Sequence, residues 1–210
     1  MSDVSKLIAQ SLLKVNAIKL QPSNPFTWAS GWKSPIYCDN RVTLSYHDVR
    51  TLIRDEFVKV VKKEFPEVEI IAGVATGAIA QGVLVADAME YPFIYIRSAA
   101  KGHGMENLIE GEVKPGQKVV VIEDLISTGG SSLKAVEALR AAGCEVLGMV
   151  AIFTYGFQTA IDNFENANVR LITLSNYNAL AELALETKYI TELQFGELKQ
   201  WRVDPSNWGK

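Results

Sequence analysis

Apolar residues recur along the chain at two different spacings, and these spacings predict its helices and strands. A stripe at helical spacing in residues 3–15 predicts an amphipathic helix, and a second stripe in residues 49–61 predicts another. The second helix should end at Phe65, because the residue before a proline is disfavoured in the helical region. Between the two helices, residues 18–42 are rich in turn formers and aromatic residues, which indicates short strands and turns.

From residue 70 onwards, short apolar runs alternate with helical stripes. The predicted strands are 70–74, 93–96, 118–122, 145–153 and 169–174. The predicted helices are 78–89, 131–142, 158–167, 176–186 and 191–199. Strands separated by single helices imply a parallel, right-handed sheet that is covered on both faces. The expected fold class is therefore α/β, with a central, mainly parallel sheet flanked by helices and a small N-terminal hood subdomain.

The length of the chain fits one domain, because 210 residues can bury a sizeable core. Residues 1–45 interrupt the strand–helix alternation, so we expect them to form a helix and a hood over the sheet edge. Residues 46–210 should form the α/β core. Within this core, residues 97–113 are long, polar and glycine-bearing, which is typical of a mobile loop.

Composition narrows the class of protein. The net charge of −3 gives no basic face for nucleic acid. No apolar stretch approaches the roughly 18 residues of a membrane span, and the amino terminus lacks a signal-peptide pattern. Cys38 and Cys144 lie in different contexts and do not suggest a disulfide framework. We therefore expect a cytoplasmic protein that binds neither nucleic acid nor membrane.

Two acids and a glycine-rich loop follow the predicted strand 118–122, in the sequence VVVIEDLISTGGSS. Free backbone N–H groups, the helix dipole and the glycines of residues 127–131 suit an anion at the start of the next helix. Glu123 and Asp124 would repel a polyphosphate, so the ligand should carry its phosphate at one end and hydroxyl groups at the other. A ribose 5-phosphate has this pattern. The alternative is a structural N-cap turn beside two solvated acids.

The same segment resembles the 5-phosphoribosyl 1-pyrophosphate (PRPP) signature of type I phosphoribosyltransferases. The resemblance implies that the two acids hold the ribose hydroxyl groups and that residues 127–131 wrap the 5-phosphate. The PRPP-binding residues expected from it are Glu123, Asp124, Leu125, Ile126, Ser127, Thr128, Gly129, Gly130 and Ser131.

Positive charges gather in the polar segment RSAAKGHGMENLIEGEVKPG. Arg97, Lys101 and His103 would suit a pyrophosphate, and cations that arrive on loop closure favour the transition state. The alternative is a solvated charged loop. The spacing resembles the catalytic loop of orotate phosphoribosyltransferases, whose basic residues reach into the neighbouring subunit's site. The resemblance implies a homodimer with shared active sites.

By the same resemblance, Lys101, His103 and Asp124 are the expected catalytic residues, and Arg97, Lys101 and His103 bind PRPP. His103 either donates a hydrogen bond to the pyrophosphate or protonates it. Ser98 stands where many members carry a second basic residue, so pyrophosphate binding should depend more on Arg97 and Lys101.

Residues 74–78 predict a second anion-facing turn, whose alternative is a plain strand-to-helix turn. In the family this turn contacts the pyrophosphate. Some members have an aromatic-lysine pair where this chain has Thr76 and Gly77, so a lysine contact is missing here.

Residues 26–41, FTWASGWKSPIYCDNR, are dense in aromatic residues and turn formers. Their aromatic rings would bury area in any packed hood, but the run resembles the amino-terminal signature of orotate phosphoribosyltransferases. The resemblance implies that Tyr37 and Cys38 flank the orotate base, that Ser127 also reaches it, and that Lys33 contacts its anionic groups. The lysine and arginine that some relatives use nearby are absent, which leaves the orotate carboxylate without an assigned ligand.

Together these resemblances predict an orotate phosphoribosyltransferase of pyrimidine synthesis, which converts orotate and PRPP into orotidine 5-phosphate and pyrophosphate. Mg²⁺ is expected as the cofactor, bound mainly through PRPP and water, because no cluster for a protein-held metal is visible in the sequence. The alternatives are a purine or xanthine phosphoribosyltransferase and a non-catalytic, PRPP-sensing regulator.

Overall fold

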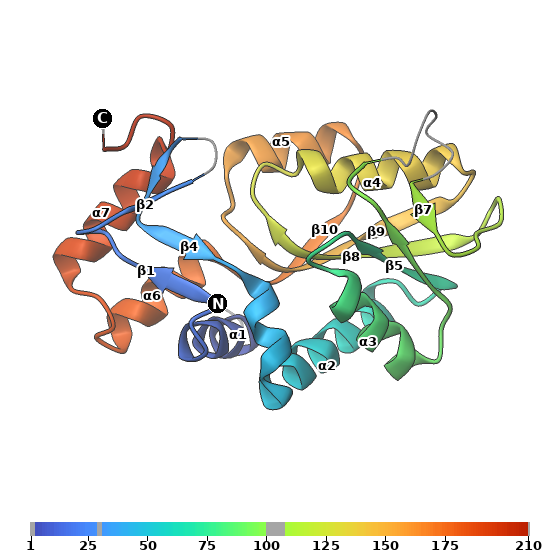
Figure 1. Cartoon of the computed structure of the whole chain (residues 1–210), viewed down its shortest axis with the longest axis horizontal. Coiled ribbons are helices and arrows are strands. Elements are labelled where there is room, and N and C mark those ends of the chain that lie inside the picture. Colours follow the sequence, from blue (N-terminus) through green and yellow to red (C-terminus); the bar gives the residue numbers. More distant parts are fainter. Residues whose placement is uncertain (1–2, 29–30, 100–107, 210) are drawn as a thin grey trace.

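A six-stranded sheet forms the centre of the molecule (Figure 1). The structure is a computed structural model and describes residues 3–28, 31–99 and 108–209. The strands lie in the order β10-β9-β8-β5-β6-β7. Their bounds are β5 (Ile70–Val74), β6 (Phe93–Ile96), β7 (Ile109–Glu110), β8 (Lys118–Ile126), β9 (Glu145–Thr154) and β10 (Leu171–Asn176). All pairings in this sheet are parallel except that of β7 with β6, which confirms the predicted fold class.

Helices cover both faces of the sheet (Figure 1). One face carries α4 (Gly130–Ala141) and α5 (Gln158–Asn166), and the other carries α1 (Asp3–Lys14), α2 (His47–Glu64) and α3 (Ile79–Met89). The strand β8 shows why its sequence is a continuous apolar run. Val120 and Ile122 belong to the core on the α1–α3 side, whereas Val119 and Val121 belong to the core under α4 and α5. A parallel strand buried on both faces needs apolar residues at every position.

Both ends of the chain build the hood beside the sheet. Strand β1 (Ile18–Leu20) pairs with β4 (Ile36–Cys38), and β2 (Phe26–Thr27) pairs with β3 (Lys33–Ser34). A 3-10 helix, η1 (Asn40–Ser45), then leads into α2. The last helices, α6 (Tyr177–Glu186) and α7 (Glu192–Val203), lie on the same side of the molecule as β1–β4 (Figure 1).

One tryptophan of α7 packs against the hood. Trp201 is fully buried, and its ring lies 5.6 Å from that of Trp28 and 5.9 Å from that of Tyr155, between ring centroids. Its indole N–H donates a hydrogen bond to the backbone carbonyl of Lys33 at 3.1 Å. The predicted hood segment therefore packs against a helix from the opposite end of the chain.

Several elements differ from the sequence-based expectation: β10 lies two residues later than predicted, α7 extends to Val203 instead of residue 199, and η1 was not predicted. Strand β8 continues to Ile126 instead of ending at residue 122, because β9 remains apolar to Phe153 and pairs with it along this length. Glu123 and Asp124 therefore lie inside a strand. The short strand β7 was not predicted, since its two residues fall within a polar segment. None of the described helices combines the length and the hydrophobicity that a membrane-spanning segment requires.

Candidate active site

Adjoining cavities lie where the parallel strands end. The first, here called the acidic cavity, has a volume of about 420 Å³ and includes Asp39, Arg41, Thr76, Gly77, Asp124 and Ser131 in its lining. The second, the aromatic cavity, has about 290 Å³ and is lined by Thr27, Trp28, Tyr37, Ser127 and Tyr155 among others. Cys38 and Leu125 line both. The two cavities thus adjoin at the carboxyl edge of the sheet, where open α/β folds bind ligands.

The two neighbouring acids of β8 have different environments. Glu123 is buried, and its two carboxylate oxygens accept hydrogen bonds from the Asp124 backbone N–H at 2.9 Å and the Ser132 hydroxyl at 2.8 Å. Burial, and then the charge of Asp124, raise the pKa of Glu123 to about 8. Asp124 is only partly buried. At neutral pH the pair therefore presents one neutral acid held by the fold beside a second acid at the cavity.

The turn after β5 approaches Asp124 closely. A Cβ added at Gly77 would overlap the Asp124 carboxyl group, with Oδ1 at 2.7 Å. Only glycine therefore fits while the Asp124 side chain keeps this position. The peptide bond between Ala75 and Thr76 is cis. The predicted anion-facing turn and the strand-end acid thus line one cavity.

The loop 127–131 begins α4 without a side-chain cap. Its shape is fixed by Gly129, which has φ +82°, and by the Asn163 side chain, which donates to the Thr128 carbonyl at 2.9 Å. The first N–H groups of an uncapped helix lack partners within the helix and suit an anion. Among the predicted PRPP-binding residues of the segment 123–131, Ser131 lines the acidic cavity, whereas Ile126 is buried in the core.

Aromatic rings form much of the second cavity. Trp28 lies 5.2 Å from Tyr155 and Tyr37 lies 5.5 Å from Phe26, between ring centroids. Tyr37, Cys38 and Ser127, all predicted to contact the base, are brought together in this lining. Such walls suit a flat, unsaturated ring.

Lys33 lies outside this lining. Its ammonium group donates a hydrogen bond to the Thr27 hydroxyl at 2.9 Å, along the β2–β3 hairpin. Thr27 lines the aromatic cavity, so Lys33 lies one residue away from it. A direct contact of Lys33 with the base stays a prediction.

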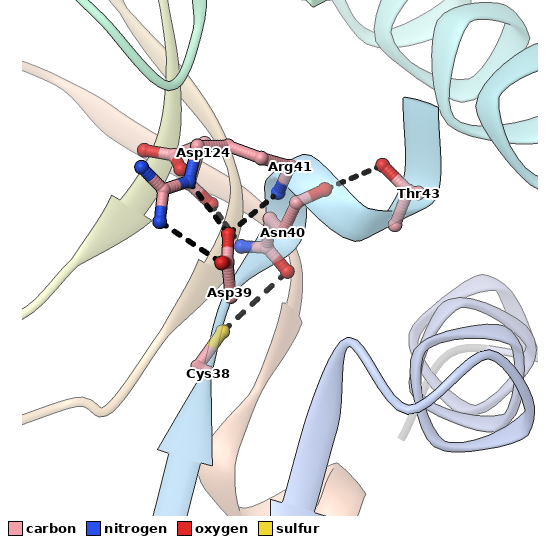
Figure 2. Close-up of polar contacts among 6 residues, drawn as sticks. All are labelled: Cys38, Asp39, Asn40, Arg41, Thr43 and Asp124. Atoms are coloured by element: carbon pink, nitrogen blue, oxygen red, sulfur yellow. Dashed lines mark hydrogen bonds and ion pairs between the residues drawn. The ribbon is translucent and has the colours of Figure 1, made fainter. Parts of the chain in front are cut away.

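Sequence reasoning missed a polar triplet beside Asp124 (Figure 2). Asp39 and Arg41 form an ion pair with an N–O distance of 2.7 Å, and Asn40 donates from its side chain to the Asp124 carbonyl at 2.6 Å. Tyr155 was missed as well. The signal for the triplet was present, since DNR directly follows the recognised SPIYC motif.

Comparisons with known proteins agree with this geometry. A family model described as "Phosphoribosyl transferase domain" matches residues 43–186. Curated orotate phosphoribosyltransferases of Bacteroides thetaiotaomicron and Porphyromonas gingivalis are 61% and 62% identical to this chain. The alignments cover 99% of this chain and 98% of the first relative, and 100% of both chains for the second. The chain belongs to the orotate phosphoribosyltransferase family.

A solved structure shares the fold as well. The crystal structure of orotate phosphoribosyltransferase from Aeropyrum pernix is 26% identical, with a TM-score of 0.76. The match covers 88% of this chain and 99% of that one.

Of the three basic residues expected to bind the pyrophosphate, the structure describes Arg97. Arg97 lines a third cavity, of about 440 Å³, which shares Val74, Ala75 and Ser131 with the acidic cavity. The Arg97 guanidinium lies 3.7 Å from the Glu110 carboxylate. Lys101 and His103 lie outside the described residues.

The oxygen donors of the acidic cavity fit a weakly held Mg²⁺. Among the described residues, no group of three or more His, Cys, Asp and Glu side chains could hold a metal ion. Asp124 nevertheless offers a partly exposed carboxylate in the cavity lining. Mg²⁺ retains waters and is commonly bound through one or two carboxylates plus substrate phosphates. Asp124 is therefore the residue that fits such an ion.

The raised pKa of Glu123 predicts a pH-dependent stability. The pKa of the folded state, about 8, exceeds the value of about 4.3 for an unfolded chain. The contribution of Glu123 to the free energy of unfolding is therefore complete at low pH and is lost as pH rises through about 8. Glu123→Gln, which stays neutral, should gain stability over the wild type by up to about 1.4 kcal/mol per pH unit between about pH 5 and 8.

Urea unfolding of the ligand-free proteins across this pH range measures the effect. Glu165→Gln, at an exposed position on α5, is the control and should follow the wild-type curve. If the unfolding free energies of Glu123→Gln and the wild type changed with pH in parallel, Glu123 would be charged in the folded protein.

Proposed function

We propose that this protein transfers the 5-phosphoribosyl group of PRPP to orotate, giving orotidine 5-phosphate and pyrophosphate in de novo pyrimidine synthesis. The observation that carries the proposal is the junction of the two cavities at Cys38 and Leu125. A planar base in the aromatic cavity would lie next to a sugar in the acidic cavity, as transfer between them requires.

The acidic cavity and the adjoining loop 127–131 would hold the sugar phosphate by both ends. Asp124 would accept hydrogen bonds from ribose hydroxyl groups, and the N–H groups of residues 127–131 would bind the 5-phosphate. As the bond from C1 to the pyrophosphate oxygen breaks, C1 becomes oxocarbenium-like, and the nearby carboxylate stabilises that charge. The base nitrogen then forms the new bond to C1 and gives up its proton, which leaves on the pyrophosphate or to solvent, and no covalent enzyme intermediate is needed.

Support for the departing pyrophosphate would come from the basic residues recognised in the sequence, Arg97, Lys101 and His103. We propose that the latter two act across the interface of a homodimer with shared sites. Mg²⁺, bound mainly through PRPP and water with Asp124 nearby, would supply charge neutralisation on the pyrophosphate oxygens. We further propose a cytoplasmic protein with one domain spanning 1–210, in which residues 1–45 form the N-terminal helix and the hood.

Pyrophosphate release with PRPP, Mg²⁺ and a panel of bases tests the proposal. Orotate should support turnover, whereas uracil, adenine, hypoxanthine and xanthine should not. Asp124→Asn is the matched inactive control, since it keeps the shape of the side chain and removes its charge. Turnover with a purine but not orotate would identify a purine enzyme. Binding of PRPP without turnover of any base would identify the non-catalytic regulator instead.

A further inference from the structure

The acidic cavity contains one unexpected cation. Among the described residues that line it, Arg41 is the one with a positively charged side chain, whereas Asp39, Glu123 and Asp124 are acidic. The acids of the cavity repel a diphosphate, and a positive charge fixed close to them reduces that repulsion. Arg41 therefore lies where a compensating charge is needed.

The Arg41 guanidinium is held in a fixed orientation (Figure 2). Its Nε and Nη2 donate to the two carboxylate oxygens of Asp39 at 2.7 and 2.9 Å. The Arg41 backbone N–H donates to the same carboxylate at 3.2 Å, where Asp39 caps η1. A guanidinium has five N–H donors, so this two-pronged pair leaves donors for a ligand. The Arg41 side chain is 59% exposed, which gives a ligand access to them.

Asn40 keeps Arg41 close to the strand-end acids. Asn40 is 2% exposed, and its side-chain amide donates to the Asp124 carbonyl at 2.6 Å. The backbone carbonyl of Asn40 accepts a hydrogen bond from the Thr43 hydroxyl at 2.6 Å (Figure 2). This buried link ties η1 to β8, so Arg41 and Asp124 lie close together (Figure 2), and both line the cavity.

We propose that Arg41 binds the diphosphate of PRPP together with the turn at residues 75–77, an inference that rests on the proposed function. Both Arg41 and this turn line the acidic cavity, whereas the loop for the 5-phosphate contributes only Ser131. The chain also lacks a lysine at residues 76–77 and a second basic residue at position 98. Arg41 supplies a cation that those positions do not.

A comparison of three ligands tests the role of Arg41. In Arg41→Gln the affinities for pyrophosphate and PRPP, measured with Mg²⁺ by calorimetry, should fall about ten- to a hundredfold, as expected for lost charge-assisted hydrogen bonds. The affinity for ribose 5-phosphate, which lacks the diphosphate, should change less than about threefold. Arg54→Gln, which removes an ion-paired arginine of α2, is the control and should leave all three affinities unchanged.

Two further variants separate binding from structure. Asp39→Asn breaks the ion pair but keeps the guanidinium, so it should retain pyrophosphate affinity to within about threefold. Arg41→Lys keeps the positive charge but not the paired N–H donors. Its affinity for pyrophosphate should fall about two- to tenfold, and its affinity for ribose 5-phosphate should not change. If Arg41→Gln fails to fold, Arg41→Lys still tests the role of the guanidinium.

Two results would overturn the inference. Equal losses for ribose 5-phosphate and pyrophosphate would mean that Arg41 acts by positioning Asp124, and wild-type affinities in Arg41→Gln would remove it from the site. Turnover of orotate by the wild type is measured separately. A wild type that fails to convert orotate, yet binds pyrophosphate through Arg41, would reject the proposed function and leave this inference standing.

Discussion

Replacing Lys101 with alanine is expected to lower kcat about 10²–10³-fold. Negative charge develops on the pyrophosphate as the bond to C1 breaks, and a cation that meets it mainly then favours the transition state. The loss corresponds to roughly 2.7–4 kcal/mol of transition-state stabilisation, by analogy with the removal of one preorganised donor. Single-turnover measurements of orotidine 5-phosphate formation separate this effect from product release.

Lys14→Ala is the control, since Lys14 is an exposed lysine on α1. A normal single-turnover rate in Lys101→Ala would remove Lys101 from the mechanism. If Lys101 acts across a dimer interface, mixing Lys101→Ala with Asp124→Asn should restore activity, because a hybrid dimer then contains one intact site. No recovery despite demonstrated subunit exchange would argue against shared sites.

Replacing Trp201 with alanine is expected to cost about 3–5 kcal/mol of unfolding free energy. Trp201 is fully buried among the rings of Trp28, Tyr155, Phe157 and Tyr177. Truncation would leave a large cavity and an unsatisfied carbonyl at Lys33. Because Trp28 and Tyr155 also line the aromatic cavity, KM for orotate should rise even where the variant is folded.

Urea unfolding at one fixed protein concentration measures this cost. Val203→Ala, on the same helix at a position that is 86% exposed, should change stability by less than about 0.5 kcal/mol. Trp201→Phe keeps most of the ring contact but loses the hydrogen bond, so about 1–2 kcal/mol is expected. A loss in Trp201→Ala no larger than that in Val203→Ala would show that α7 does not support the hood.

Local patterns predicted most of the sheet because the physical causes are local. The run from Val119 to Ile122 must be apolar on both faces, and α2 ends at Glu64, one residue before the predicted end at Phe65, which is its C-cap. The extension of β8 through Glu123 and Asp124 was missed because acids are poor strand signals by themselves. Their strand conformation depends on pairing with β9, which is distant in sequence.

The unpredicted parts of the site depend on long-range contacts. Trp201 and Lys33 meet across 168 residues, and Asn40 meets Asp124 across 84. No spacing rule relates such pairs. Arg41 stood within a recognised motif, yet its proximity to Asp124 became visible only when η1 and β8 were placed side by side. Lys101 and His103 stay predictions from sequence.

The close approach of Gly77 to Asp124 has a consequence for directed evolution of this cleft. A library that varies position 77 alone would return mainly inactive clones, since any larger residue evicts the acid next to it. Randomising both codons together would not rescue them, because the proposed function requires the carboxylate of Asp124. Positions 77 and 124 are therefore constrained together, although they lie 47 positions apart along the chain.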